Sequence, residues 1–237
     1  MKIIIFGANG QTGRLLTRQT LDAGHEAVAV TRSPHNFPFS DSGLTVAAGD
    51  VRSTEALPGV LEGADAVLST LGVPMRMGAI DTYSSGAANI VAAMRRAAVR
   101  RLVVVSSTAV TDYPGRTGTP FALKFVEPIL KSTLGRSTYA DQRRMEQMVS
   151  TSGLAWTIVR PSGLFDLRQV TDYVAGHVDP VGAFTSRSDL AHYLLTLAQQ
   201  QGPQATVTIS TVTDTPTLWE MVRREAFPQP KNAAASS

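Results

Sequence analysis

Three glycines near the start of the chain have the spacing of a phosphate-binding turn. Gly7, Gly10 and Gly13 follow the apolar run 2–6 and precede the part-apolar stretch 14–21. Between a strand and a helix, the first glycine permits a tight turn, the second lets the backbone approach a pyrophosphate, and the third lets the helix pack on the strand. The N–H groups at the helix start then face the phosphate charge. This context predicts dinucleotide binding, with a purely structural glycine turn as the alternative.

Arg32 and Ser33 stand at the end of the second predicted strand, 25–31. Sites that prefer NAD place Asp or Glu about 20 residues beyond the glycines, where it binds the ribose 2′-hydroxyl. A guanidinium instead makes paired, charge-assisted hydrogen bonds to a 2′-phosphate, and a serine hydroxyl adds another. These two residues therefore favour NADP(H). The alternative is that Arg32 is an ordinary exposed arginine.

Polar and small residues also lie at or just beyond the ends of the next three predicted strands. Asp50 is placed to accept a hydrogen bond from an adenine amino group, or to form a plain turn. Gly72 would let a ribose approach the backbone closely. Ser106 and Ser107 are placed to polarise a substrate carbonyl or, equally, to cap the next segment. Parallel strands present such residues at one edge of a sheet, where open α/β folds bind their ligands.

Strands and helices alternate along most of the chain. We predict strands at 2–6, 25–31, 44–48, 64–70, 101–107, 154–160, 170–175 and 205–210, and helices at 14–21, 53–61, 80–99, 121–134, 137–152, 189–199 and 217–226. The alternation up to residue 160 predicts an α/β fold of the Rossmann type, a doubly wound parallel sheet with helices on both faces.

The composition is that of an ordinary globular protein. The 237 residues are 43% hydrophobic, which is enough for one core. We predict one dinucleotide-binding domain at 1–227, whose small substrate lobe lies mainly at 165–227. The last segment, 228–237, is small and polar, and we expect it to be disordered.

Several classes of protein are disfavoured by the same composition. The chain has no cysteine, and its four histidines lack metal-ligand spacing, so we expect no disulfide and no metal. The net charge is only +3 and basic residues are scattered, which argues against nucleic-acid binding. No apolar run reaches the roughly 18 residues of a membrane span, and we expect no signal peptide before the first strand. We expect a cytoplasmic monomer or homodimer that acts on a small-molecule substrate.

Several motifs together carry a family resemblance. They are Phe6-Gly-Ala-Asn-Gly-Gln-Thr-Gly13, Val30-Thr-Arg32, Gly49-Asp50-Val51, Arg101-Leu-Val-Val-Val-Ser-Ser107 and Trp156-Thr-Ile-Val-Arg-Pro161. The chain resembles the atypical short-chain dehydrogenase/reductases over residues 1 to about 200. It is most similar to the NAD(P)H-binding branch that includes the biliverdin-IXβ/flavin reductases and the regulators of nitrogen metabolite repression.

The resemblance implies that NADP(H) lies across the carboxyl ends of the strands. The residues it implies as cofactor contacts are Gly7, Asn9, Gly10, Gln11, Thr12, Gly13, Arg32, Asp50, Leu71, Gly72 and Ser106, with Pro161, Ser162, Gly163 and Leu164 against the nicotinamide end. We also predict that Ser33 and Val51 contact the cofactor.

The expected catalytic residues depart from the family pattern. Ordinary members use Ser with Tyr-x-x-x-Lys, in which Tyr is the general acid and Lys lowers its pKa. The matching helix here reads Tyr139-Ala-Asp-Gln-Arg143, with arginine in place of lysine. We predict Ser107, Tyr139 and Arg143 as the catalytic set. The alternative concerns the alignment of this helix with the family branch, which rests on Asp141 and Glu146. That alignment would move Tyr139 out of the site.

These features predict an NADPH-dependent reductase that passes hydride to a carbonyl, quinone or flavin-like acceptor. We expect the acceptor between 113–134 and 165–184, which carry aromatic and aliphatic residues suited to a flat ligand. An acceptor with its own proton source needs little acid catalysis, consistent with the missing lysine. Two alternatives stay open: a non-catalytic NADP(H) sensor read by a partner protein, and an epimerase or isomerase that retains its cofactor.

Overall fold

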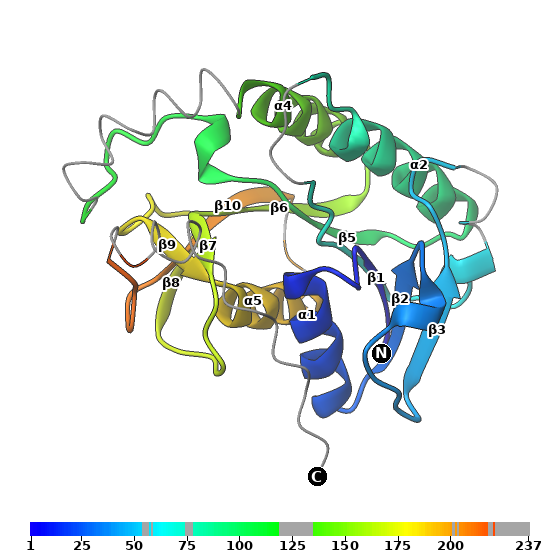
Figure 1. The fold of residues 1–237 in the computed structure, drawn as a ribbon. Coiled ribbons are helices and arrows are strands. Elements are labelled where there is room, and N and C mark those ends of the chain that lie inside the picture. Colours follow the sequence, from blue (N-terminus) through cyan, green and yellow to red (C-terminus); the bar gives the residue numbers. More distant parts are fainter. Residues whose placement is uncertain are drawn as a thin grey trace, which may run out of the picture.

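An eight-stranded sheet with helices on both faces forms the centre of the computed structural model (Figure 1). The structure describes residues 1–53, 57, 59–73, 78–118, 135–200, 202, 204–217 and 220. In spatial order the strands are β3 (Leu44–Ala48), β2 (Glu26–Thr31), β1 (Lys2–Phe6), β4 (Ala66–Ser69), β5 (Arg101–Val105), β6 (Ala155–Pro161), β10 (Ala205–Thr211) and β8 (Tyr173–Gly176). All neighbours are parallel except β10 and β8. The prediction of a doubly wound parallel sheet is confirmed.

The central strand β1 shows why this sequence forms a buried parallel sheet. Ile3, Ile4, Ile5 and Phe6 are completely buried. β1 pairs with β2 on one side and β4 on the other, in register Ile3–Ala27 and Ile3–Ala66. A continuous β-branched run suits a strand that is covered on both faces. The order of the strands reverses between β1 and β4, and this is the point where open α/β sheets form a ligand crevice.

Among the residues that the structure describes, two helices cover each face of the sheet. Helices α1 (Gln11–Asp22) and α5 (Arg187–Gln199) lie on one face, and α2 (Thr82–Arg96) and α4 (Arg136–Ser150) on the other (Figure 1). Alternate residues of β1 enter opposite cores: Ile3 and Ile5 pack in the α1/α5 core, and Ile4 and Phe6 in the α2/α4 core.

Helices α2 and α4 are joined by a buried carboxylate. Asp141 on α4 is completely buried, and its Oδ2 accepts the backbone N–H of Tyr83 at 2.9 Å. Its Oδ1 accepts the hydroxyl of Ser84 and a guanidinium N–H of Arg144. The side chain thus caps the start of α2 from a neighbouring helix. The family motif residue Asp141 therefore serves the fold.

The structure differs from the sequence-based prediction beyond β6. Two short strands that were not expected, β7 (Gly163–Phe165) and β9 (Phe184–Ser186), form a parallel pair. Among the described residues, the segment 53–61 forms only the 3-10 turn η2 (Gly59–Leu61); two further 3-10 turns are η1 (Pro34–Asn36) and η3 (Thr108–Val110). The helix predicted at 121–134, most of that at 217–226 and the tail at 228–237 lie outside the described residues. Within the described ranges, no helix combines the length and apolarity that crossing a bilayer requires.

Candidate functional site

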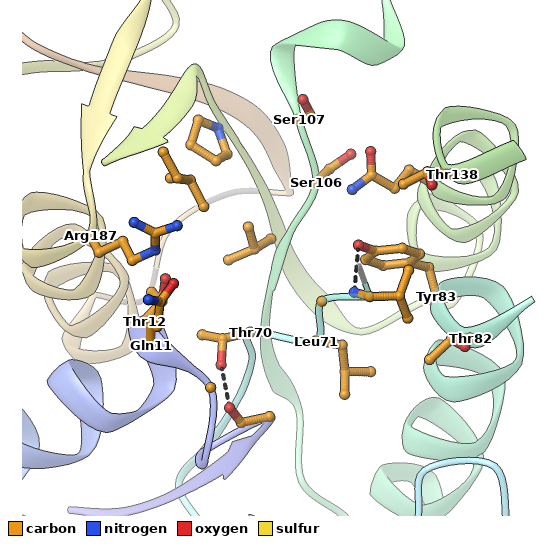
Figure 2. Close-up of a pocket in the computed structure, with 18 of the residues that line it drawn as sticks. Gln11, Thr12, Thr70, Leu71, Thr82, Tyr83, Ser106, Ser107, Thr138 and Arg187 are labelled. Carbon is orange, nitrogen blue, oxygen red and sulfur yellow. Dashed lines mark hydrogen bonds between the residues drawn. The ribbon is translucent and has the colours of Figure 1, made fainter. Parts of the chain in front are cut away.

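A cleft of about 1190 Å³ opens at the carboxyl edge of the parallel strands. It is lined by the ends of β1, β2, β4, β5 and β6 and by the beginnings of α1, α2, α4 and α5 (Figure 2). Every residue predicted to contact a cofactor lines it, except Gly13. The residues that were predicted to contact the cofactor therefore lie on one continuous surface. Their contacts with a cofactor stay predictions.

The glycine turn has the geometry that its spacing predicts. Gly7 has φ +75°, and a Cβ there would lie 2.7 Å from the carbonyl oxygen of Thr70. A Cβ on Gly13 would lie 2.2 Å from the carbonyl oxygen of Gly7, so Gly13 sits beneath the turn, in the contact between α1 and β1. Helix α1 begins at Gln11 and its N-cap is Gly10, which offers no side-chain cap. The helix therefore presents its first N–H groups to the cleft.

Basic residues mark the end of the cleft beside β2 and β3. Arg32 is exposed, and no ion pair links it to any residue in the described ranges. Asp50 uses its Oδ1 to accept the N–H of Arg52 at 2.9 Å, so one of its oxygens supports the turn. The Oδ1 of Asn9 accepts Nε and Nη2 of Arg14, at 3.0 and 2.7 Å, which braces the glycine loop against α1.

At the opposite end of the cleft, three buried polar atoms have no hydrogen-bond partner among the described residues. They are Ser106 Oγ, Thr138 Oγ1 and Gln142 Oε1, on side chains that are 4%, 6% and 6% exposed. Figure 2 shows Ser106 and Thr138 on the same side of the cleft. A buried polar atom without a hydrogen bond is costly, and native proteins rarely leave several together. The arrangement is suited to a ligand that supplies both donors and acceptors.

Helix α4 presents a different pair of residues to the cleft than the sequence suggests. Thr138 and Gln142 line it, four residues apart on one face. Tyr139 also lines the cleft, but Arg143 is exposed and donates from Nη1 to the carbonyl of Val110 at 2.9 Å. Each position along a helix turns the side chain by roughly 100°. Arg143, one position after Gln142, therefore points away from the cleft. The structure therefore brings Ser107 and Tyr139 to the cleft and leaves Arg143 out of it.

The sequence itself indicates which face of α4 turns inward. The buried positions of α4 are Thr138, Asp141, Gln142, Met145, Glu146 and Val149, which recur at three- and four-residue steps. The apolar members Met145 and Val149 define the inward face by themselves. Extending that face toward the N-terminus leads to Gln142 and Thr138, and not to the Tyr139–Arg143 pair.

Two further polar residues stand near this end of the cleft. The hydroxyl of Tyr83 on α2 accepts the N–H of Val73 at 3.3 Å, and burial raises the pKa of this tyrosine. Ser107 accepts the N–H of Ala109 at 3.1 Å and thereby caps η3. Both hydroxyls keep a proton to donate.

Glu146 has a structural partner outside the cleft. It forms an ion pair with Arg160, whose Nε donates to Glu146 Oε1 at 2.9 Å. Arg160 Nη1 also donates to the hydroxyl of Tyr113 at 3.1 Å. The hydrogen bond to Glu146 raises the pKa of the Arg160 guanidinium. The motif residue Glu146 thus links α4 to β6.

Comparisons with known proteins agree with this geometry. A family model described as NAD(P)H-binding matches residues 7–201. The (4-alkanoyl-5-oxo-2,5-dihydrofuran-3-yl)methyl phosphate reductase of Streptomyces griseus is 30% identical over 159 residues, 67% of this chain and 46% of that protein. Photosystem II assembly factor Ycf39 of Synechocystis is 29% identical over 117 residues, 48% of this chain and 36% of that protein. The chain thus matches less than half the length of either relative.

A solved structure shows the same fold over most of the chain. A short-chain dehydrogenase/reductase from Veillonella parvula, in complex with NADP, superposes with a TM-score of 0.74 at 22% identity, covering 92% of this chain and 99% of that one. The sheet order, the glycine turn and the family match over residues 7–201 lead to one conclusion. The chain belongs to the NAD(P)H-binding family.

Proposed function

We propose that this protein is an NADPH-dependent reductase that transfers hydride to a carbonyl, quinone or flavin-like small molecule. The observation that carries the proposal is one continuous cleft, which runs from the basic Arg32 past the glycine turn to the unpartnered polar atoms near Ser106. The reductase name of the Streptomyces relative supports this class of reaction.

The residues of the cleft fit a dinucleotide. The volume of about 1190 Å³ exceeds that of usual small-ligand pockets, which run to about 1,000 Å³. The backbone is closely packed at Gly7 and Gly13, and the N-terminus of α1 opens beside it. Ser106, Thr138 and Gln142 offer the unmade hydrogen bonds that ribose hydroxyls and a carboxamide would complete.

A preference for the phosphorylated cofactor follows from the end of β2. Arg32 lies at the cleft with no acidic partner within the described part of the chain, so its guanidinium is available to a 2′-phosphate. Ser33 adds a hydroxyl at the same place. The NADP bound by the Veillonella protein is consistent with such a site in this fold.

The residues at the other end would orient the reactants. The nicotinamide of a bound cofactor supplies the hydride. Backbone and side chains at 161–164 line that end of the cleft, where they would hold the carboxamide. The hydroxyls of Ser107 and Tyr139 would donate hydrogen bonds to the acceptor oxygen. No lysine lines the described part of the cleft, so an acceptor protonated by solvent, such as a quinone or flavin, suits the site best.

Turnover of purified protein tests this function. NADPH absorbance would be followed with quinone, flavin and ketone acceptors, and we expect oxidation that depends on the acceptor. Ser107→Ala and Tyr139→Phe should lower kcat, with Arg143→Ala as the matched control outside the cleft. Tight NADPH binding without turnover on any acceptor class would contradict a reductase.

That outcome would favour a second candidate, a protein that senses NADP(H). The observation behind it is that Thr138 and Gln142 face the cleft at the spacing of the family's Tyr-x-x-x-Lys pair. Neither side chain is a proton donor of useful acidity. A sensor requires the cofactor site and not the catalytic pair.

A further inference from the structure

Arg187 lines the cleft, although no sequence motif points to it. It is the first residue of α5, and both its neighbours are buried and hydrogen-bonded. The N–H of Ser186 donates to Thr211 Oγ1 on β10 at 2.8 Å, and Gln19 Nε2 on α1 donates to the carbonyl of Ser188 at 3.2 Å. These contacts fix the backbone of Arg187 between the sheet and α1.

The guanidinium of Arg187 forms only a weak ion pair within the described part of the protein. Its side chain is 19% exposed, and Nη1 donates to Asp166 Oδ1 at 2.9 Å. Asp166 is 63% exposed, and ion pairs with exposed partners contribute little. Within the described ranges, Asp166 is its single hydrogen-bond partner. Most of its N–H donors are therefore available to a ligand.

The position of the side chain indicates what it binds. Figure 2 shows Arg187 directed into the cleft beside Gln11 and Thr12. These two residues begin α1, whose N–H groups and dipole attract an anion. A planar guanidinium binds phosphate oxygens in pairs. Helix α1 and Arg187 thus offer donors to the same space from two elements.

We infer that Arg187 binds the pyrophosphate of the dinucleotide, together with the N-terminus of α1. This inference rests on the proposed dinucleotide binding and adds a contact from α5. An anionic group on the acceptor is the other source of the same chemistry. The structure favours the pyrophosphate because Arg187 lies beside Gln11 and Thr12 at the start of α1 (Figure 2).

Nucleotide titrations of matched variants test the inference. We would measure the Kd of NADPH and of NADH for the wild type, Arg187→Ala, Arg187→Lys, Asp166→Asn and Arg96→Ala. Because both nucleotides contain the pyrophosphate, Arg187→Ala should weaken both by the same factor, about tenfold or more. Arg187→Lys keeps the charge without the paired geometry and should fall between. Arg96 is exposed at the end of α2, and its substitution should change neither Kd.

The Asp166→Asn variant separates binding from structure. It removes the same ion pair but leaves the guanidinium, so we expect it to retain wild-type affinity. Equal losses in Asp166→Asn and Arg187→Ala would overturn the inference, because the ion pair would then be what matters. Unchanged nucleotide affinity in Arg187→Ala, with or without a raised KM for an anionic acceptor, would overturn it as well. If the wild type itself binds neither nucleotide, the proposed function fails together with this inference.

Discussion

At the scale of single residues, the proposed preference for NADPH depends on Arg32. Arg32→Glu places a carboxylate where a 2′-phosphate would bind, so repulsion replaces a charge-assisted pair. We expect the NADPH affinity to fall about tenfold or more, while the NADH affinity falls much less. Titration of both nucleotides measures the ratio. An unchanged NADPH affinity would show that the phosphate lies elsewhere.

Thr138 offers a test with two readouts of opposite sign. Its hydroxyl is buried and has no partner, so Thr138→Val removes an unsatisfied polar atom at almost constant volume. We expect the ligand-free protein to become more stable, by about 1 kcal/mol, because the desolvation penalty disappears. NADPH binding or turnover should weaken because the ligand loses a partner.

Denaturant unfolding and NADPH titration of the same variant provide the two readouts. The exposed Gln147→Ala, on the same helix, is the control and should change neither. If Thr138→Val weakens neither binding nor turnover, the hydroxyl does not face the ligand.

At the scale of elements, the packing of α1 against β1 determines whether the glycine turn can form. A Cβ on Gly13 would lie 2.2 Å from the carbonyl oxygen of Gly7. Gly13→Ala must therefore push the helix off the strand, and we expect a loss of about 2 kcal/mol or more, with weaker NADPH binding. Gly59→Ala is the control, since nothing lies within 4 Å of the added methyl. Equal free energies of unfolding for the two variants would contradict this packing.

Helix α4 shows the same dependence on a neighbouring element. Asp141 caps α2, and Glu146 pairs with Arg160 on β6. These two contacts set the rotation of α4, and with it the exposure of Thr138 and Gln142 to the cleft. Asp141 and Glu146 therefore position the wall of the cleft that α4 forms.

At the scale of the whole molecule, one buried and two half-buried tyrosines predict how stability depends on alkaline pH. Burial raises the pKa of Tyr83, Tyr173 and Tyr193 above 10.0. The folded state then holds protons that the unfolded state releases, so the free energy of unfolding falls as pH rises above about 10. Below that pH these groups add no slope.

Denaturant unfolding at a series of pH values checks this behaviour. Tyr83→Phe lacks the titrating proton, so its free energy of unfolding should decline less steeply above about pH 10 than that of the wild type. Parallel curves for the two proteins would show that Tyr83 ionises as freely in the folded state as in the unfolded state.

The sequence by itself determined the sheet, the glycine turn and the residues that line the cleft beside this turn. These features rest on local signals, namely the β-branched run before Gly7, the glycine spacing, and helix periodicity. The tertiary structure decided that Thr138 and Gln142 face the cleft instead of Arg143, that β7 pairs with β9, and that Arg187 lies beside the start of α1. The reason is physical: each depends on contacts between segments far apart in the chain, such as Asp141 with Tyr83 and Gln19 with Ser188. A local pattern does not encode such contacts.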